Sequence, residues 1–248
     1  MPAARASTID RDEVERFSAL APEWWNESGA FRPLHRLNPA RIEYARDRFA
    51  GHFARSIKQR AAFAGLSLLD IGCGGGLMAE PMTRLGFTVA GIDADAAALG
   101  IAREHAAAQG LIIDYRRAAV EQLAAAKRAF DAVLALEVVE HAADAALFMA
   151  QAARLVKPGG ALLLSTLNRT PRAFATAIIG AEYILRWLPR GTHQYRKFRR
   201  PSELARDVRA AGLVVGDIAG LGYDPWHDCW HRTTDLGVNY LLFATKPK

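Results

Sequence analysis

Residues 68–76 read LLDIGCGGG, and the rest of the chain is best understood from this segment outward. An apolar run carries one acid, Asp70, near its carboxyl end and leads into a loop that contains Gly72, Gly74 and two further glycines. A helix-forming segment, 77–85, follows. Glycine lets backbone N–H groups approach a ligand closely, and a helix N-terminus carries a positive dipole end. We therefore predict a ligand site where a strand passes into a helix.

A second short apolar run, 87–92, ends at Asp93, which lies 21 positions after Gly72. In doubly wound sheets, an acid at the end of the second strand holds the ribose hydroxyls of a nucleotide. The two features together predict a pocket for a nucleoside-bearing cofactor at the carboxyl ends of two neighbouring parallel strands.

The glycine spacing helps to identify this cofactor. The dinucleotide motif needs Gly or Ala at position 77, where this chain has Leu77, and the same pattern counted from Gly74 begins two residues too late. A carboxylate at Asp70 would also repel a phosphate beside the loop. A cofactor with an ammonium and a sulfonium group suits this acid better. We predict S-adenosylmethionine, bound by Asp70, Gly72, Gly74 and Asp93.

The chain alternates between strand-like and helix-like segments from residue 66 onward. Strands are expected near 66–71, 87–92, 111–116, 130–136, 160–167, 213–219 and 237–246, with helices near 76–85, 95–109, 144–155 and 201–211. This rhythm predicts an α/β fold with a single doubly wound, mostly parallel seven-stranded sheet of Rossmann-like type. The methyl-donor domain is expected over 61–248, with a helical insertion at 168–200 after the fifth strand.

Residues 1–60 are expected to add a tail and capping helices to this domain. We expect a disordered tail at 1–10, a helix from 10 to 25, and a second helix that Asn38 and Pro39 open and that runs to about residue 58. The chain has 248 residues with 51% hydrophobic content, which is typical of a globular protein. Two cysteines and a charged N-terminal segment indicate a reducing, cytoplasmic location.

The insertion has an apolar part, 173–188, which Glu182 and Arg186 interrupt, so it is too short and too charged to span a bilayer. A cationic run, 186–200, follows and contains no acid. This pattern is typical of an interfacial helix on an anionic membrane surface. It also suits a lid over a substrate pocket, and the sequence leaves both interpretations open.

A second polar cluster, LEVVEH at 136–141, follows the fourth strand, at the sheet edge where open α/β folds bind ligands. If the turn is helical, Glu137, Glu140 and His141 project from one face and could bind a divalent cation such as Mg²⁺. His141 alone could instead act as a general base. The remaining alternative is a solvated acidic turn with His141 capping a helix.

The chain as a whole resembles the class I S-adenosylmethionine-dependent methyltransferases, and more closely the ubiquinone-biosynthesis O-methyltransferases. The segments that carry this resemblance are WW at 24–25, FRPLHRLNP at 31–39, LDIGCGGG at 69–76, EVVEH at 137–141, LVKPGG at 155–160, STLNR at 165–169, GAEYILR at 180–186, GTH at 191–193 and VNY at 238–240. The glycine loop alone indicates only the superfamily, whereas 31–39 and 180–186 indicate the family.

The resemblance implies cofactor contacts at Arg41, Gly72, Asp93 and Leu136. Arg41 would pair with the methionyl carboxylate, and Leu136 would contact the adenosyl group. It also implies a divalent metal, Mg²⁺ being the expected ion, at Glu137, Glu140 and His141, in agreement with their spacing.

The implied reaction is methyl transfer to a hydroxyl of a polyprenylated catechol or hydroquinone. A bound Mg²⁺ would lower the pKa of the attacking hydroxyl, and His141 or His193 would accept its proton. The implied partners are this lipid-like acceptor, an anionic membrane surface on the inner side of a membrane, and a biosynthetic complex. The chain departs from the family pattern at 223–231, YDPWHDCWH, which we interpret as a variable loop beside the substrate entrance.

Three alternatives differ from this function in the acceptor or in the activity. Another small-molecule phenol could be the acceptor. A nucleic-acid methyltransferase is disfavoured, and no nucleic-acid partner is expected, because no Asp/Asn-Pro-Pro-aromatic segment follows the fourth strand. A non-enzymatic binding module is disfavoured by the cluster at 137–141.

Overall fold

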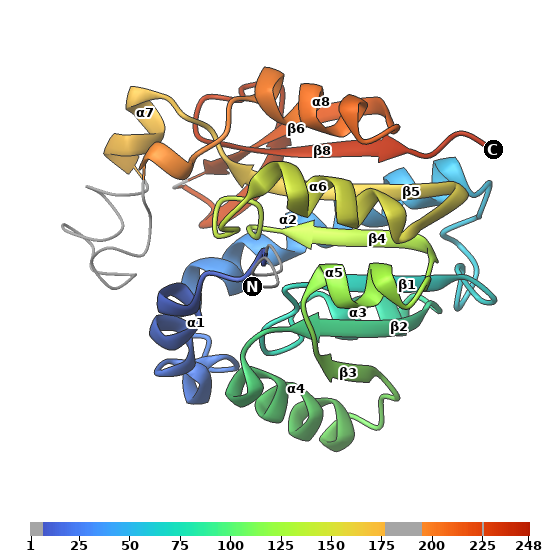
Figure 1. The fold of residues 1–248 in the computed structure, drawn as a ribbon. Helices are drawn as coiled ribbons and strands as arrows, with labels where there is room; N and C mark the ends of the chain where they lie inside the picture. Colours follow the sequence, from blue (N-terminus) through green and yellow to red (C-terminus); the bar gives the residue numbers. More distant parts are fainter. Residues whose placement is uncertain (1–6, 177–194, 225) are drawn as a thin grey trace, which may run out of the picture.

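The computed structural model describes residues 7–176, 195–224 and 226–248, which form a sheet between layers of helices (Figure 1). The described strands are β1 (Ser67–Ile71), β2 (Thr88–Asp93), β3 (Asp114–Arg117), β4 (Phe130–Leu136), β5 (Val156–Leu167), β6 (Val214–Asp224), β7 (Cys229–Thr233) and β8 (Asn239–Thr245). Their order in the sheet is β3-β2-β1-β4-β5-β8-β6-β7. The first five strands pair in parallel, whereas β8, β6 and β7 pair antiparallel. The predicted α/β class and mostly parallel sheet are confirmed.

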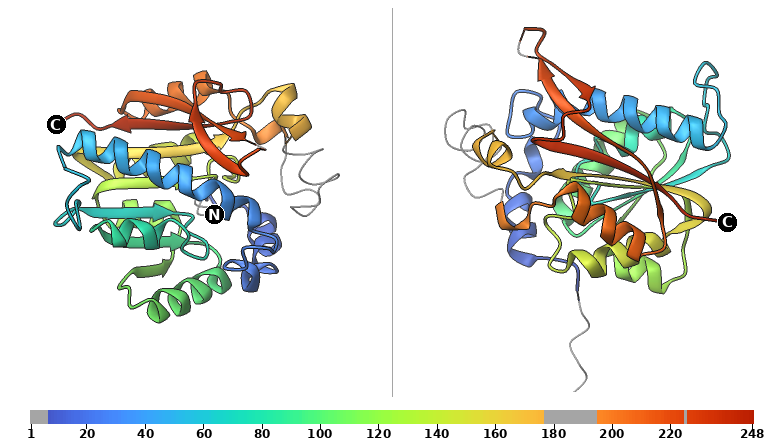
Figure 2. Two further views of the ribbon diagram at one scale, coloured as in Figure 1. Left: turned by 180° about the vertical axis from the view of Figure 1, so that it is seen from behind. Right: turned by 90° about the horizontal axis from the view of Figure 1, so that it is seen from above.

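Helices cover both faces of the sheet (Figure 2). One face packs against α2 (Arg32–His52), α3 (Ala79–Arg84) and α4 (Ala96–Ala108). The other packs against α5 (Val120–Ala125), α6 (Ala145–Arg154) and α8 (Pro201–Ala210). Residues of β4 alternate between the two cores: Leu134 belongs to the first and Val133 to the second. Burial on both faces explains why β4 is apolar from Ala132 to Leu136.

The carboxyl ends of β1, β2 and β4 lie side by side. Asp70 in β1 is in register with Gly91 of β2 and Leu134 of β4. From β1 the sheet continues to β2 and β3 on one side and to β4 and β5 on the other, so the crossover connections diverge at this strand. Open α/β sheets bind ligands in the crevice at such a switch point.

The predicted second helix is wrong in its bounds. The helix α2 begins at Arg32, with Pro33 in its first turn, and Pro39 lies inside it. Leu37, Asn38 and Ala40 are buried on either side of Pro39. This packing outweighs the local cost of a proline, because tertiary context overrides intrinsic helix propensity.

The sheet has one strand more than predicted. The segment that we interpreted as a variable loop at 223–231 contributes to a hairpin in which β7 pairs with the end of β6. Trp226 near its turn is 92% exposed. Neither Trp226 nor any residue of β7 lines the pocket described below, so the expected position beside the substrate entrance is not supported.

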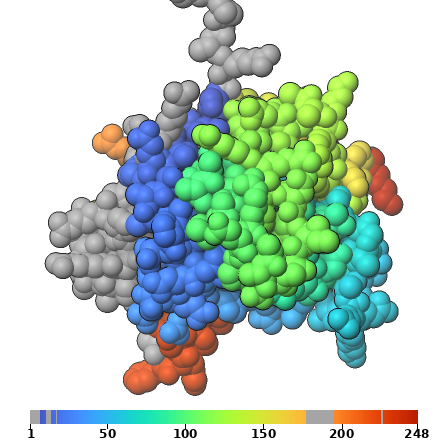
Figure 3. Space-filling model, turned by 90° about the horizontal axis from the view of Figure 1, so that it is seen from below, coloured from blue at the N-terminus to red at the C-terminus, as the bar shows by residue number. Residues whose placement is uncertain are grey.

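The N-terminal segment continues the fold rather than trailing from it. Its described part contains α1 (Arg11–Ser18) and the 3-10 helix η1 (Ala21–Glu23) and lies alongside α4 (Figure 3). The Thr8 hydroxyl donates to Glu121 Oε2 at 2.7 Å, and the Ala143 amide donates to Thr8 O at 3.1 Å. The expected disordered tail is therefore wrong for residues 7–10, because a buried Thr8 ties them to α5 and to the loop after β4.

Candidate active site

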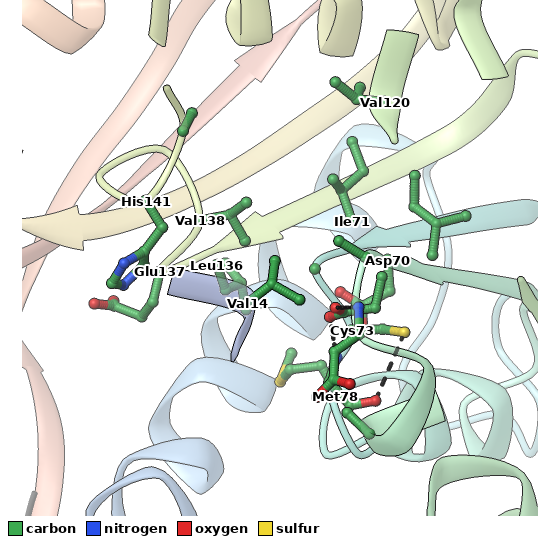
Figure 4. Close-up of a pocket in the computed structure, with 18 of the residues that line it drawn as sticks. Val14, Asp70, Ile71, Cys73, Met78, Val120, Leu136, Glu137, Val138 and His141 are labelled. Carbon is green, nitrogen blue, oxygen red and sulfur yellow. Dashed lines mark hydrogen bonds between the residues drawn. The ribbon is translucent and has the colours of Figure 1, made fainter. Parts of the chain in front are cut away.

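A cavity of about 290 Å³ opens where β1, β2 and β4 end. Its lining includes the predicted cofactor contacts Arg41, Asp70, Gly72, Gly74, Asp93 and Leu136, together with Glu137 and His141. Figure 4 shows Glu137 and His141 together at the end of β4, with Asp70 and Cys73 on the other side of the view. The structure therefore brings both sequence clusters to one pocket.

The glycine loop follows β1 with a backbone that only glycine adopts easily. Gly72 and Gly74 have φ values of +68° and +50°, in the left-handed region. A Cβ atom at Gly72 would lie 2.5 Å from Val138, and one at Gly74 would lie 2.3 Å from Trp24. The loop is thus packed tightly between the turn after β4 and the N-terminal segment, with its backbone against the pocket.

Asp70 is a buried acid at the pocket. Its side chain is buried, and its Oδ2 atom has no hydrogen-bond partner among the described residues. Burial, and secondarily the nearby Asp93 carboxylate, raise the pKa of Asp70 to about 7. A cationic ligand group would give this oxygen a partner and stabilise its charged form. S-adenosylmethionine fits this requirement.

Asp93 is held in place by the backbone around it. Its Oδ2 atom accepts from the Gly74 amide at 2.9 Å, and its Oδ1 atom accepts from the Asp95 amide at 2.8 Å. Burial raises the pKa of Asp93, while these amide hydrogen bonds act in the opposite direction. The acid therefore lies at the end of β2 as predicted and also links β2 to the glycine loop.

Arg41 reaches the pocket from α2, far from the glycine loop in sequence. Its side chain is 4% exposed, and Nη2 donates to Glu137 Oε1 at 2.6 Å. The residue patterns alone would have placed it on an exposed helix surface, and only the family resemblance pointed to it. Leu136, the last residue of β4, completes this side of the pocket.

The turn after β4 is not helical. Glu137 has a φ of +56°, a left-handed conformation that is rare outside glycine and occurs at functional sites. Its Oε1 atom also accepts from the Ser165 hydroxyl at 2.8 Å. The expectation that Glu137, Glu140 and His141 project from one helical face is therefore wrong.

Glu140 and His141 take different positions as a result. Glu140 is buried and does not line the pocket, whereas His141 does. Burial, and secondarily the Glu137 charge, raise the pKa of Glu140 well above its usual range. No group of three His, Cys, Asp or Glu side chains with the arrangement of a metal site occurs in the described ranges. The structure thus does not assemble the predicted three-ligand set.

Both carboxylate oxygens of Glu140 are nevertheless buried, beside the side chains of Glu137 and Thr166. Carboxylate and imidazole groups are suitable ligands for a divalent cation. The chemistry of this donor set therefore fits a metal, although its arrangement is not that of a formed site. His193, the other predicted proton acceptor, lies outside the described residues.

Residues 8–31 form a roof over the pocket that the sequence analysis missed. Thr8, Ile9, Asp10, Val14, Trp24 and Phe31 all line the cavity. Trp25 donates from Nε1 to Gly75 O at 3.0 Å and stacks on His105 with ring centroids 3.5 Å apart. The adjacent residues Trp24 and Trp25 could have indicated this contact, because two large aromatic side chains in a polar segment are expected to pack against another part of the protein.

The insertion is described only up to residue 176 and from 195 onward, so most of its apolar part lies outside the described residues. In the cationic run, Lys197 pairs with Asp10 at 2.9 Å and Arg199 pairs with Asp207. Part of this charge is thus satisfied within the protein. No helix in the described ranges is long and apolar enough to cross a membrane.

A methyltransferase domain model matches residues 44–217, most of the chain. A ubiquinone biosynthesis O-methyltransferase from Chelativorans sp. (strain BNC1) is 54% identical over 247 residues, which cover 100% of this chain and 98% of the relative. A second ubiquinone biosynthesis O-methyltransferase, from Mesorhizobium japonicum, is 52% identical over 246 residues, which cover 99% of each chain.

Solved structures of methyltransferases share the fold. Magnesium protoporphyrin IX methyltransferase from Synechocystis PCC 6803 with bound SAH has a TM-score of 0.64 at 18% identity, over 96% of this chain and 100% of that one. A SAM-dependent methyltransferase from Thermotoga maritima has a TM-score of 0.61 at 16% identity, again over 96% and 100% of the two chains.

Proposed function

The chain belongs to the ubiquinone biosynthesis O-methyltransferase family, and we propose that its described pocket moves a methyl group from S-adenosylmethionine to a hydroxyl of a polyprenylated catechol or hydroquinone. The observation that carries this proposal is that a buried acid, Asp70, and a buried cation, Arg41, both line one switch-point pocket. S-adenosylmethionine carries an ammonium, a sulfonium and a carboxylate, so it offers a partner of opposite charge to each side chain.

We assign the parts of the cofactor to different residues on this basis. Asp70 attracts the cationic groups, Arg41 binds the methionyl carboxylate, and Asp93 receives the ribose hydroxyls. Gly72 and Gly74 let the loop backbone approach the cofactor, and Leu136 contacts its adenosyl part. The positions of these residues around one cavity support the assignment.

Methyl transfer is a direct displacement in this proposal. The acceptor oxygen attacks the methyl carbon in line with the departing sulfur, the carbon–sulfur bond breaks, and its electron pair stays on the sulfur of S-adenosylhomocysteine. The acceptor hydroxyl loses its proton to His141, which lines the pocket beside Glu137. His193 stays a second candidate for this role. The roof over the pocket limits access of water to the sulfonium group.

We further propose that Glu137, Glu140 and His141 hold a divalent cation such as Mg²⁺ when the acceptor is present. The buried carboxylate of Glu140 beside that of Glu137 supports this assignment. When bound, the ion would lower the pKa of a chelated catechol hydroxyl. The turn at 137–141 would have to rearrange to bring the three ligands together.

The prenyl tail of the acceptor requires contact with a bilayer, so we propose that the insertion 168–200 acts at an anionic membrane surface, as a lid, or as both. Phe174, near the start of its apolar part, is 40% exposed. Cosedimentation with vesicles of anionic phospholipid at low and high salt distinguishes membrane binding from a role as a lid alone. Absence of binding at low salt would leave only the lid.

The central experiment combines the chain with radiolabelled S-adenosylmethionine and a short-tailed catechol. We expect label in the catechol, a lower rate after chelation of divalent ions, and no label in a simple monohydric phenol. Transfer to the phenol alone would identify another small-molecule acceptor. Retention of the full rate after chelation would remove the metal from the proposal while leaving the methyltransferase activity intact.

A further inference from the structure

The described lining of the pocket has a single strongly basic side chain. Among the described residues that line it, Arg41 is the only Lys or Arg side chain, and it is 4% exposed. Its guanidinium pairs with Glu137, whose side chain is 21% exposed. An arginine buried this deeply needs an anionic partner, because leaving its charge unpaired is costly.

Glu137 has a second partner that does not depend on Arg41. Its Oε1 atom accepts from the Ser165 hydroxyl at 2.8 Å, and the Glu137 amide donates to Ser165 Oγ at 3.1 Å. The left-handed backbone of Glu137 fixes the side chain at the end of β4. If Arg41 changes partner, Ser165 therefore still holds Glu137 in the pocket.

We propose that Arg41 exchanges partners during the reaction cycle, as a positioning residue. In the empty protein it pairs with Glu137, and on cofactor binding its guanidinium moves to the methionyl carboxylate and releases Glu137 toward the acceptor hydroxyls. This inference rests on the proposed cofactor and acceptor. The consequence is that the cofactor binds before the acceptor. A cofactor ligand that has the methionyl carboxylate prepares the acceptor site, whereas a ligand that lacks this carboxylate does not.

The first test measures cofactor affinity by calorimetry with two probes. S-adenosylhomocysteine has the carboxylate, whereas 5′-methylthioadenosine lacks the amino-acid part. Glu137→Gln removes the competing charge, so we expect S-adenosylhomocysteine to bind about tenfold more tightly, within the usual range of coupling between sites. The affinity for 5′-methylthioadenosine should change less than about twofold, which also shows that the pocket is folded.

The matched variants separate exchange from a general change in pocket charge. Arg41→Met should lower the affinity for S-adenosylhomocysteine by about tenfold or more and leave the affinity for 5′-methylthioadenosine unchanged. In the Arg41→Met background, Glu137→Gln should no longer strengthen binding. Arg46→Met serves as control, because Arg46 is on the same helix but pairs with Asp47 at the surface. It should leave both affinities unchanged.

The second test measures binding of a short-tailed catechol by calorimetry, with no methyl donor present. S-adenosylhomocysteine should tighten catechol binding about tenfold in the wild-type chain, whereas 5′-methylthioadenosine should not. The effect should be lost in Arg41→Met. Because no methyl group is transferred, this readout is independent of catalytic rate.

The outcomes distinguish the inference from the proposed function. If Glu137→Gln leaves S-adenosylhomocysteine affinity unchanged, or strengthens it equally without Arg41, the exchange is refuted while methyl transfer is unaffected. If both adenosyl ligands tighten catechol binding equally, the exchange is also refuted. A wild-type chain that binds S-adenosylhomocysteine but neither binds nor methylates a catechol would instead contradict the proposed acceptor.

Discussion

Replacement of Asp70 by Asn should stabilise the cofactor-free protein and lower its affinity for S-adenosylmethionine. The Asp70 carboxyl is buried, and its pKa rises from 3.8 to about 7, chiefly because burial disfavours the charged form. Since one pKa unit is worth about 1.4 kcal/mol, charging this group in the folded state costs up to about 4 kcal/mol. Asparagine has nearly the shape of the protonated acid and avoids this cost.

The sign of the pH dependence follows from the raised pKa. The folded state binds the Asp70 proton more tightly than the unfolded state does. The contribution of Asp70 to wild-type stability is therefore most favourable below about pH 4 and decreases as the pH rises to about 7. Relative to wild type, Asp70→Asn should therefore match it at low pH and be more stable by up to about 4 kcal/mol above pH 7.

Urea denaturation of both proteins without cofactor, at several pH values between 4.5 and 8.5, measures this difference. Asp114→Asn is the control, because Asp114 lies on β3 in an exposed ion pair with Arg116. It should change stability by less than about 1 kcal/mol. An Asp70→Asn advantage that stays constant or shrinks as the pH rises would refute the reasoning. S-adenosylmethionine should bind more weakly to Asp70→Asn at pH 8.

Three further substitutions test the pocket. Gly74→Ala should lower cofactor affinity and destabilise the protein by about 1–3 kcal/mol, because its Cβ would lie 2.3 Å from Trp24 at a φ of +50°. Calorimetry measures the affinity and urea denaturation measures the stability. Wild-type values of both would contradict the tight packing of the loop. Thr8→Val removes the hydroxyl hydrogen bond to Glu121 and should speed release of S-adenosylhomocysteine several-fold in stopped-flow experiments. An unchanged rate would mean that the roof does not control release. Glu140→Gln should keep cofactor affinity but abolish the effect of Mg²⁺ on transfer, whereas a persisting metal response would exclude Glu140 as a ligand.

Sequence reasoning succeeded where local chemistry dictates local structure. The loop containing Gly72 and Gly74 needs left-handed backbone, and glycine supplies it directly after a buried strand. Asp93 follows an apolar run of the right length, so its place at the end of β2 could be predicted from the chain alone. The register between β1, β2 and β4 then brings these residues to the same edge of the sheet as Glu137.

The remaining features depend on contacts between distant segments. Arg41 is buried beside Glu137, which lies 96 residues further along the chain, and no local pattern indicates this contact. The left-handed Glu137 is stabilised by Ser165, 28 residues away. Strand β7 is an edge strand with mostly exposed residues, so its sequence, CWHRT, lacks the alternation that identifies half-buried strands. The position of the roof could not be predicted, because Thr8 is buried against α5, which lies 113 residues further along the chain.

The tryptophans of the roof give the protein an intrinsic optical reporter. Trp24 lines the cavity and stacks on Phe31 with ring centroids 3.9 Å apart, and Trp25 contacts the glycine loop and His105. An adenosyl ring entering the cavity changes the surroundings of these indoles, so their emission reports occupancy without a label. Ligand screening by fluorescence thus becomes practical on the unmodified chain, and a Trp24→Phe protein identifies how much of the signal comes from the pocket.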